Sequence, residues 1–218
     1  MVQAGRMDVV LPCLDEAAAL PAVLASLPAG YRAIVVDNGS SDGSPEVAAA
    51  YGALVVHESK RGYGAAIHTG LLAATSGLVA FADADGSLDL AELPAMAALL
   101  ADADLVVGRR RPVHAGVWPW HARAGNAVIA SLLRRRGLDV HDIAPLRVCR
   151  REALLALDVQ DRAFGYPLEL LVRAAEADWR VREVDVAYRA RAAGTRSKVS
   201  GSVRGTLRAA RDMAGVLR

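Results

Sequence analysis

Two acidic residues, Asp83 and Asp85, stand one alanine apart directly after the apolar run of residues 78–82. In an extended segment, residues i and i+2 point to the same side, so both carboxylates would face one ligand. Such a pair can hold Mg²⁺ or Mn²⁺, which take oxygen ligands and commonly bridge to the phosphates of a substrate. The same spacing also occurs in turns, because Asp caps turns and helices readily. The pair therefore predicts a metal site for a phosphorylated substrate, with a simple turn as the alternative.

Polar segments after other apolar runs indicate how such a substrate could be held. Residues 37–43, Asp-Asn-Gly-Ser-Ser-Asp-Gly, form either a loop of turn formers or a site where Asp37 accepts a hydrogen bond from a nucleobase or ribose. Residues 60–64, Lys-Arg-Gly-Tyr-Gly, precede an expected helix, and such a helix start favours anions. Residues 12–16 lack the Gly-x-Gly-x-x-Gly pattern, which disfavours a dinucleotide site.

If the protein is an enzyme whose substrate reacts through a hydroxyl group, a carboxylate must take the proton of that hydroxyl. Asp85 and Glu169 are the candidates for this role. Glu169 lies in the apolar segment 168–172. It therefore either acts on a substrate or pairs with Arg173, four residues later on the same expected helix.

Short apolar runs alternate with segments of helical length in the first half of the chain. The runs predict buried strands at residues 9–11, 33–36, 54–56, 78–81 and 105–107. The segments between them predict helices at residues 16–27, 44–51, 64–75 and 90–100, with caps at Ser44 and Asp89. This alternation predicts a parallel sheet whose ligands bind at the carboxyl ends of the strands. The polar segments above would then share one rim.

The second half of the chain is less regular. It predicts helices at residues 121–136, 151–157 and 168–177, a loop at 142–145 and a strand at 181–188. A basic loop at 189–201 leads to a final helix at 202–217. We expect this helix either to lie on an anionic membrane surface without spanning the bilayer or to pack on its own domain.

Charge is distributed unevenly along the chain. Residues 1–107 contain 4 Lys/Arg and 13 Asp/Glu, whereas residues 108–218 contain 22 and 11. An acidic half suits a divalent cation, and a basic half suits phosphate or an anionic surface. A nucleic-acid ligand is disfavoured, because aromatic residues amount to only 5% and the acidic half would repel phosphate.

The composition of the 218 residues is that of one globular domain, with 53% hydrophobic and 23% charged residues. Apolar stretches fall short of the roughly 20 residues that span a bilayer, and the first residues do not resemble a secretory signal. Cys13 and Cys149 lie far apart, which argues against a disulfide framework and a zinc site. We therefore expect a cytoplasmic α/β protein.

Five motifs follow one another at the expected strand ends. They are Val10-Leu11-Pro12-x-x-x-Glu16, Val36-Asp37-Asn38-Gly39-Ser40-x-Asp42-Gly43, Lys60-x-Gly62-x-Gly64-x-Ala66-x-x-x-Gly70, Asp83-Ala84-Asp85 and Gly108-x-Arg110. In this order they resemble the family 2 glycosyltransferases with the GT-A fold. Within that family the chain is most similar to the polyprenyl-phosphate branch, which includes dolichol-phosphate mannose synthase.

The likeness covers the first 110 residues well and continues more loosely to the basic segment Thr195-Arg196-Ser197-Lys198. It implies one GT-A domain over residues 1–218, a mostly parallel sheet flanked by helices. Residues 1–110 would form the nucleotide-sugar and metal half. Residues 111–218 would form the acceptor half.

The resemblance also implies a role for individual residues. Those expected to bind the nucleotide sugar are Pro12, Glu16, Asp37, Lys60, Asp83 and Arg110. Asp83 and Asp85 would hold Mg²⁺ or Mn²⁺. Those expected to bind the acceptor or its phosphate are Arg123, Arg196 and Lys198. The chain departs from the family at Asn38, where an acidic residue is frequent, and at Ser87, where the branch commonly has Gln.

Together these features predict an inverting, metal-dependent transfer of sugar from a UDP- or GDP-sugar to an acceptor. The expected acceptor is a lipid-linked phosphate, a polyprenyl phosphate, reached by peripheral contact with the inner face of the membrane. A soluble hydroxyl acceptor stays open as an alternative, as do a nucleotidyltransferase of similar fold and a non-catalytic binder of anionic ligands. A nucleotidyltransferase would carry a Gly-rich loop with Arg and Lys after the first strand, and a binder would keep its affinity without divalent metal.

Overall fold

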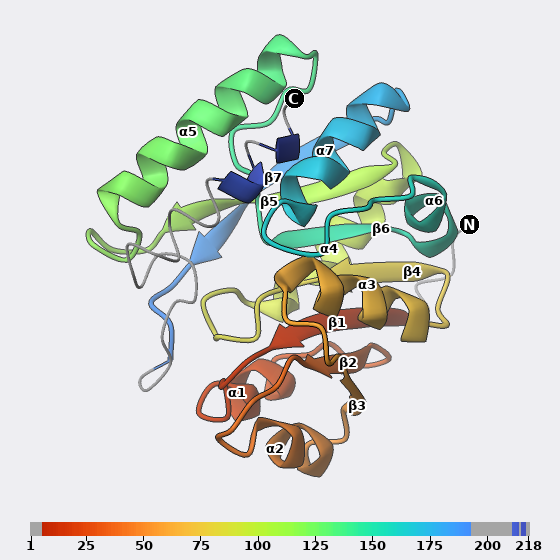
Figure 1. Ribbon diagram of the computed structural model, residues 1–218, viewed down its shortest axis with the longest axis vertical. Helices are drawn as coiled ribbons and strands as arrows, with labels where there is room; N and C mark the ends of the chain where they lie inside the picture. Colours follow the sequence, from red (N-terminus) through yellow and green to blue (C-terminus); the bar gives the residue numbers. More distant parts are fainter. Residues whose placement is uncertain (1–5, 193–210, 214, 217–218) are drawn as a thin grey trace.

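The computed structural model describes residues 6–192, 211–213, 215 and 216. Its strands form one seven-stranded sheet in the order β3-β2-β1-β4-β6-β5-β7 (Figure 1). The strands are β1 (Met7–Cys13), β2 (Arg32–Asp37), β3 (Leu54–His57), β4 (Leu78–Phe81), β5 (Leu105–Pro112), β6 (Leu146–Arg150) and β7 (Val181–Tyr188). In the part of the chain that the structure describes, only β6 runs antiparallel to its neighbours. The sheet is therefore mostly parallel, as expected.

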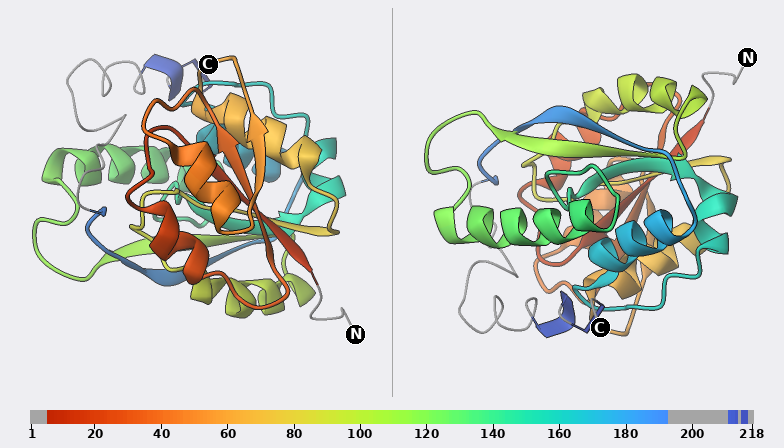
Figure 2. Two further views of the ribbon diagram at one scale, coloured as in Figure 1. Left: turned by 90° about the horizontal axis from the view of Figure 1, so that it is seen from below. Right: turned by 90° about the horizontal axis from the view of Figure 1, so that it is seen from above.

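Helices cover both faces of the sheet, and each face has its own buried core (Figure 2). The helices of the first core are α1 (Leu20–Ala25), α2 (Ser44–Ala50) and α4 (Leu93–Ala98), the last flanked by the 3-10 turns η1 (Leu90–Glu92) and η2 (Leu99–Ala101). Those of the second are α3 (Tyr63–Ala73), α5 (Trp120–Arg135), α6 (Arg151–Ala156) and α7 (Tyr166–Glu176).

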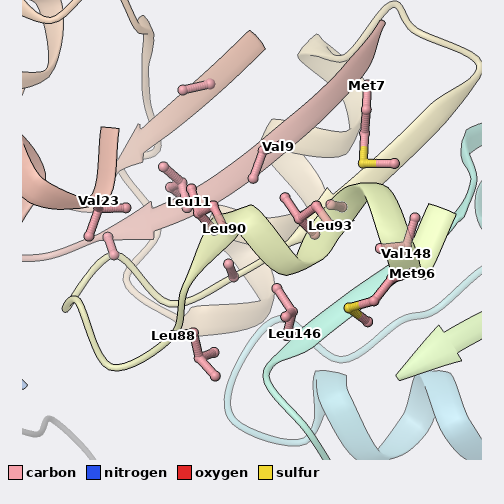
Figure 3. Close-up of a cluster of buried hydrophobic side chains, with 14 of the residues drawn as sticks. Met7, Val9, Leu11, Val23, Leu88, Leu90, Leu93, Met96, Leu146 and Val148 are labelled. Carbon is pink, nitrogen blue, oxygen red and sulfur yellow. The ribbon is translucent and has the colours of Figure 1, made fainter. Parts of the chain in front are cut away.

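Strand alternation divides the apolar side chains between the two cores. Val9 and Leu11 of β1 enter the first core and Val10 enters the second. In the first core, side chains of α4 and its flanking turns pack against β1 and β6 (Figure 3). Because both faces are buried, the central strands consist of continuous apolar residues, which is the pattern expected of a covered parallel sheet.

Two of the expected helices begin differently in the structure. The helix expected at 16–27 starts only at Leu20, because the preceding residues belong to the loop after β1. Ser44 is the first residue of α2 rather than its cap, and Gly43 occupies the cap position in a left-handed conformation. Asp89 caps the 3-10 turn η1, which precedes α4, because its side chain accepts a hydrogen bond from the Ala91 amide at 3.0 Å.

The strand β6 is absent from the expectations. Its sequence, Leu-Arg-Val-Cys-Arg, looks polar, yet Arg147 is buried and Val148 and Cys149 lie in the two cores. The Arg147 guanidinium donates to the backbone carbonyls of Ile143 and Ala144. Because its polar atoms are satisfied locally, this arginine can lie inside the sheet.

The C-terminal end is described only in part. Residues 211–213, 215 and 216 are helical, and Met213 and Val216 pack against the second core. The rest of the helix expected at 202–217 lies outside the described residues. So do Arg196 and Lys198 of the basic loop before it. Among the helices that the structure describes, none is long and apolar enough to cross a bilayer.

Asp8 joins three segments at the edge of the sheet opposite the polar rim. Its carboxylate accepts two hydrogen bonds from Arg32 of β2, each of 2.8 Å, and two from the Thr75 and Ser76 amides before β4. Burial acts to raise the pKa of Asp8, but the hydrogen bonds from Arg32, Ser76 and Thr75 outweigh it and hold the pKa below its usual value.

We expect Asp8→Asn to lower the free energy of unfolding at pH 7 by about 1–3 kcal/mol, because buried donors lose a charged acceptor. Since the pKa of Asp8 is lowered in the folded protein, its contribution is complete above the unfolded pKa and is lost as the pH falls through the folded value. Urea unfolding at pH 7 and near pH 3 should show the difference shrinking in acid. Asp139→Asn, at an exposed aspartate, is the control, and an Asp8 variant as stable as this control would contradict the assignment.

Candidate functional site

The polar segments singled out in the sequence meet at one edge of the sheet. Strands β1, β2, β3 and β4 run parallel, so their carboxyl ends lie along the same rim. β5 and β7 end there too, and the antiparallel β6 begins there. The rim therefore gathers loops from both halves of the chain.

The loops after β1 and β2 are joined by side-chain hydrogen bonds. The Asp15 carboxylate accepts from the Ser41 amide at 2.8 Å, and Asp42 accepts from the Ala17 amide at 2.9 Å. In return, the Ser44 hydroxyl accepts from the Glu16 amide at 2.9 Å. These bonds fix the backbone around Glu16, which is buried.

Asp37 is the last residue of β2, Asn38 follows it, and their side chains bind different loops. Asp37 accepts from the Gly39 and Ser40 amides and lies 3.3 Å from His57 Nδ1. Burial acts to raise the pKa of Asp37, but these hydrogen bonds lower it overall. Asp37 is thus held as an ionised acceptor at the carboxyl end of β2.

The Asn38 amide holds the loop after β3. Its Nδ2 donates to the carbonyl oxygens of Glu58 and Lys60 at 2.8 and 2.9 Å, and its Oδ1 accepts from the Gly62 amide at 2.8 Å. A carboxylate at this position would have no hydrogen to donate to the two carbonyls. The departure from the family pattern at Asn38 therefore has a local structural reason.

The start of α3 is not the anion site expected for residues 60–64. The amides of Gly64 and Ala65 donate to the carbonyls of Ala163 and Arg162 at 2.9 and 2.8 Å. A Cβ on Gly64 would lie 2.7 Å from the Asp161 carbonyl oxygen, so the glycine permits this close approach. The amides of Gly64 and Ala65, which could otherwise bind an anion at the helix start, therefore donate to carbonyls of the chain itself.

Asp83 and Asp85 follow β4 with their carboxylates close together. Burial and the negative charge of Asp85 raise the pKa of Asp83 to about 6, while Arg191 and Arg110 act in the opposite direction. Asp85 is 2% exposed, and its Oδ1 accepts from the Ser87 amide at 2.9 Å. Asp83 is thus half-buried, Asp85 is buried, and the charge of Asp85 acts on Asp83 at the end of β4.

The segment that follows β7 lies across this acidic loop. The amides of Arg189 and Ala192 donate to the carbonyls of Ser87 and Asp85 at 2.9 and 3.0 Å. Arg191 Nη1 lies 2.7 Å from Asp85 Oδ2, in an ion pair that lacks the angular geometry of a hydrogen bond. Residues 189–192 thus place a positive charge directly against the Asp-x-Asp pair.

These residues fit a divalent cation. The Ser87 hydroxyl is fully buried and has no hydrogen-bond partner among the described residues. Together with the two carboxylates it forms an oxygen-only donor set, which suits Mg²⁺ or Mn²⁺. No group of three or more His, Cys, Asp or Glu side chains in the described part of the chain could hold a metal. The other ligands would therefore come from a bound phosphate and water.

Arg110, on β5, is held rigidly at the rim. Its Nε and Nη2 donate to the two carboxylate oxygens of the buried Asp142 at 2.8 and 2.6 Å. Its guanidinium carbon lies 4.0 Å from the centre of the Trp118 ring and 5.5 Å from that of Tyr188. Arg110 Nη1 makes no hydrogen bond to a described residue, so this nitrogen remains for a ligand.

Glu169, the second candidate base, is engaged within the protein. Its carboxylate accepts from the amides of Gln160 and Asp161 and from Arg173 Nε at 2.6 Å. Burial acts to raise the pKa of Glu169, but these hydrogen bonds lower it overall. Of the two possibilities that the sequence left open for Glu169, the structure shows the pair with Arg173 on the same helix.

The remaining expected residues are only partly brought together. Pro12 lies near the carboxyl end of β1, and Lys60 is exposed beside Asn38. Arg123 is exposed in the first turn of α5, and no hydrogen bond or ion pair within the described ranges joins it to the acidic loop.

Asp142 and Arg191 were missed as site residues. Asp142 is one acidic residue in an unremarkable loop, and its partner Arg110 lies 32 positions away. Arg191 was visible only as one member of a basic run. The charge pattern assigned the basic half to phosphate or an anionic surface, and the fold in addition brings Arg191 against the acidic pair.

Comparisons with known proteins identify the family of the chain. The model of the family Glycosyl transferase family 2 matches residues 8–157. An uncharacterised glycosyltransferase of Mycobacterium tuberculosis is 60% identical over 94% of this chain and 95% of its own length. A dolichyl-phosphate hexose transferase of Haloferax volcanii is 34% identical over 87% of this chain and 86% of its own.

A solved structure is similar in architecture. It is glucosyl-3-phosphoglycerate synthase of Mycobacterium tuberculosis, solved in complex with Mn²⁺, uridine diphosphate and glucosyl-3-phosphoglycerate. The match covers 98% of this chain and 79% of the synthase chain, with a TM-score of 0.76 and 24% sequence identity. At this identity the likeness shows the fold alone. It confirms the expected GT-A architecture.

We expect Asn38→Asp to destabilise the protein, although the family often has an acidic residue there. The change removes both donors from the Glu58 and Lys60 carbonyls and sets a carboxylate against them, at a cost of about 2–3 kcal/mol. Asn38→Ala, which removes the same hydrogen bonds without adding charge, should cost less. Urea unfolding of both variants measures the difference, and an Asp variant at least as stable as the Ala variant would refute the role given to the amide.

Proposed function

The chain belongs to glycosyl transferase family 2, and from this membership we propose that it transfers a sugar from a nucleotide sugar to a polyprenyl phosphate, with inversion at the anomeric carbon. The protein is thus a glycosyltransferase rather than a nucleotidyltransferase or a non-catalytic binder. The named activity of the relative that is 34% identical supports the choice of acceptor.

The observation that carries the proposal is the meeting of opposite charges at the rim. The first half contributes the Asp83 and Asp85 carboxylates, and the second contributes Arg110 and Arg191. A sugar nucleotide has a diphosphate that needs both a cation held by carboxylates and direct partners for its oxygens. A divalent cation shared with the phosphate oxygens would offset the repulsion between the two carboxylates.

The nucleoside would lie over the ends of β1, β2 and β3. The backbone at Pro12 and Glu16 would line its pocket, and Lys60 would approach the base or ribose. Asp37 would accept a hydrogen bond from the nucleoside at the carboxyl end of β2, where it is held as an ionised acceptor. Because neighbouring loops fix these residues in advance, binding would require little rearrangement.

At the reacting centre, the departing diphosphate gains negative charge as the glycosidic bond breaks through an oxocarbenium-like state. A divalent cation held by Asp83 and Asp85 would neutralise part of this charge and orient the leaving group. Arg191 already lies against Asp85 and would supply further positive charge to the same group. Both effects favour the transition state over the bound substrate.

The engaged state of Glu169 favours a phosphate acceptor over a hydroxyl acceptor. A hydroxyl must lose a proton to a base, whereas a phosphate oxygen is already anionic at pH 7. Glu169 accepts hydrogen bonds from two backbone amides and Arg173, and Asp85 is paired with Arg191. Arg123, Arg196 and Lys198 would bind the acceptor phosphate. We assign Arg110 to this phosphate as well, although the resemblance placed it with the nucleotide sugar, and leave Arg191 as the partner of the donor diphosphate. Its lipid would be met at an anionic membrane surface, which the basic C-terminal segment would contact.

Nucleoside diphosphates should stabilise the protein in the presence of Mn²⁺. At 100 times its dissociation constant, a ligand adds about 2.7 kcal/mol, which raises the melting temperature by roughly 5–10 °C for a domain of this size. Thermal-shift measurements with UDP and GDP, with and without Mn²⁺, test this expectation. Asp85→Asn should abolish the metal-dependent shift and reduce turnover by about 10²-fold or more, whereas exposed Asp102→Asn should behave as the wild type. Absence of any metal-dependent shift would overturn the nucleotide-sugar proposal.

The acceptor class can be decided by where labelled sugar is found. With a radiolabelled nucleotide sugar and polyprenyl phosphate in detergent, we expect label in a butanol-extractable lipid and release of one nucleoside diphosphate per sugar. The parallel reaction receives a water-soluble acceptor, 3-phosphoglycerate. Label confined to the aqueous product would reject the polyprenyl-phosphate acceptor while leaving the glycosyltransferase assignment intact.

A further inference from the structure

The loop of residues 141–144, which precedes β6, is held by an acidic residue that none of the motifs includes. Glu183 of β7 accepts hydrogen bonds from the backbone amides of His141 and Asp142 on the same oxygen, Oε1, at 2.6 and 3.0 Å. Its other oxygen lies 2.9 Å from His141 Nδ1. The Glu183 side chain is only 10% exposed. One carboxylate therefore fixes two successive residues of the loop.

Asn126 of α5 holds the same loop from a second element. Its Nδ2 donates to the His141 carbonyl, and its Oδ1 accepts from the Ile143 amide, each at 3.1 Å. Asn126 is buried, unlike most of α5. The backbone on either side of Asp142 is thus fixed by side chains of β7 and α5 together.

The residue between these fixed points is the one that orients Arg110. Asp142 accepts from the backbone amide of Arg110 and from its guanidinium, and also from the Ala144 amide at 3.0 Å. Both edges of the Asp142 carboxylate are therefore occupied, and a shift of the loop would move the guanidinium with it. The aromatic rings of Trp118 and Tyr188 limit where that guanidinium can go.

We propose that Glu183 is a positioning residue for the acceptor phosphate, acting through the loop 141–144 and Asp142 to hold Arg110 with Nη1 presented to that phosphate. This inference rests on the proposed function, because it takes Arg110 to bind the acceptor. Glu183 itself touches no substrate. Its effect falls on acceptor binding and leaves the nucleotide and metal part of the rim unchanged.

The test compares two acidic residues of β7. Glu183 lies 3.9 Å from Arg109 of β5, and Asp185 lies 2.8 Å from Arg111 of the same strand. Glu183→Ala should raise the KM for polyprenyl phosphate about tenfold, with the KM for the nucleotide sugar unchanged. Glu183→Gln keeps an acceptor for the two amides and should recover most of the loss. Asp185→Ala, which removes an exposed ion pair with Arg111, is the matched control and should resemble the wild type. Equal changes in both KM values, or none, would overturn the proposal.

A double-mutant cycle tests whether Glu183 acts through Arg110. If it does, Glu183→Ala should change the acceptor KM by less than about twofold once Arg110→Ala is present. An undiminished effect in that background would reject the pathway through Arg110. Asn126→Ala removes the hydrogen bonds that hold the loop from α5 and should likewise raise the KM for polyprenyl phosphate. This variant replaces Glu183→Ala in the test if Glu183→Ala folds poorly.

A spectroscopic readout separates this proposal from the acceptor assignment. With Trp120→Phe and Trp179→Phe, Trp118 is the remaining tryptophan, and Arg110 lies over its ring. Glu183→Ala should shift the Trp118 emission and Asp185→Ala should not. A shift without any transfer to polyprenyl phosphate would keep the positioning role and reject the acceptor, whereas an unchanged emission would reject the positioning role.

Discussion

Two negative charges lie side by side at the end of β4, in a place that is largely shielded from water, and their repulsion is the constraint around which the rim is built. Burial alone would favour protonation of these groups. The chain compensates by bringing in two arginines from the ends of β5 and β7. The acidic pair comes from the first half of the sequence and both arginines come from the second, so the two halves meet at this rim.

The loops around that pair are ordered by polar side chains as well as by apolar packing. Asp15, Asp42 and Asn38 each accept from or donate to backbone groups of a neighbouring loop, and Asp142 accepts from a backbone amide of β5. Loops at the end of a parallel sheet leave the strand ladder and need other partners for their amides and carbonyls. These residues supply the partners and thereby fix the backbone from which the ligand-binding side chains project.

Local pattern was sufficient to predict the parallel half of the fold. Short apolar runs with polar ends fixed the positions of β1 to β5, and the carboxyl-end rule brought Asp37, Asp83 and Asp85 to one rim. It was insufficient for β6, because the burial of Arg147 depends on two carbonyls contributed by its own loop. The helix start after residues 60–62 was predicted wrongly as an anion site for a related reason. The amides of Gly64 and Ala65 are bonded to residues about a hundred positions further along the chain.

The junction between α3 and the loop before α7 also bears on the order in which the protein can fold during synthesis. The family match ends at residue 157, yet the amides of Gly64 and Ala65 find their partners at residues 163 and 162. At about 5–20 residues per second, a ribosome needs roughly 5–20 s to deliver those carbonyls after α3 has emerged. For most of that interval, the edge of β4 that pairs with β6 is also exposed, because β6 has not yet been synthesised. The nascent first half thus carries an open strand edge and an unfinished helix start, the kind of surface on which a chaperone acts.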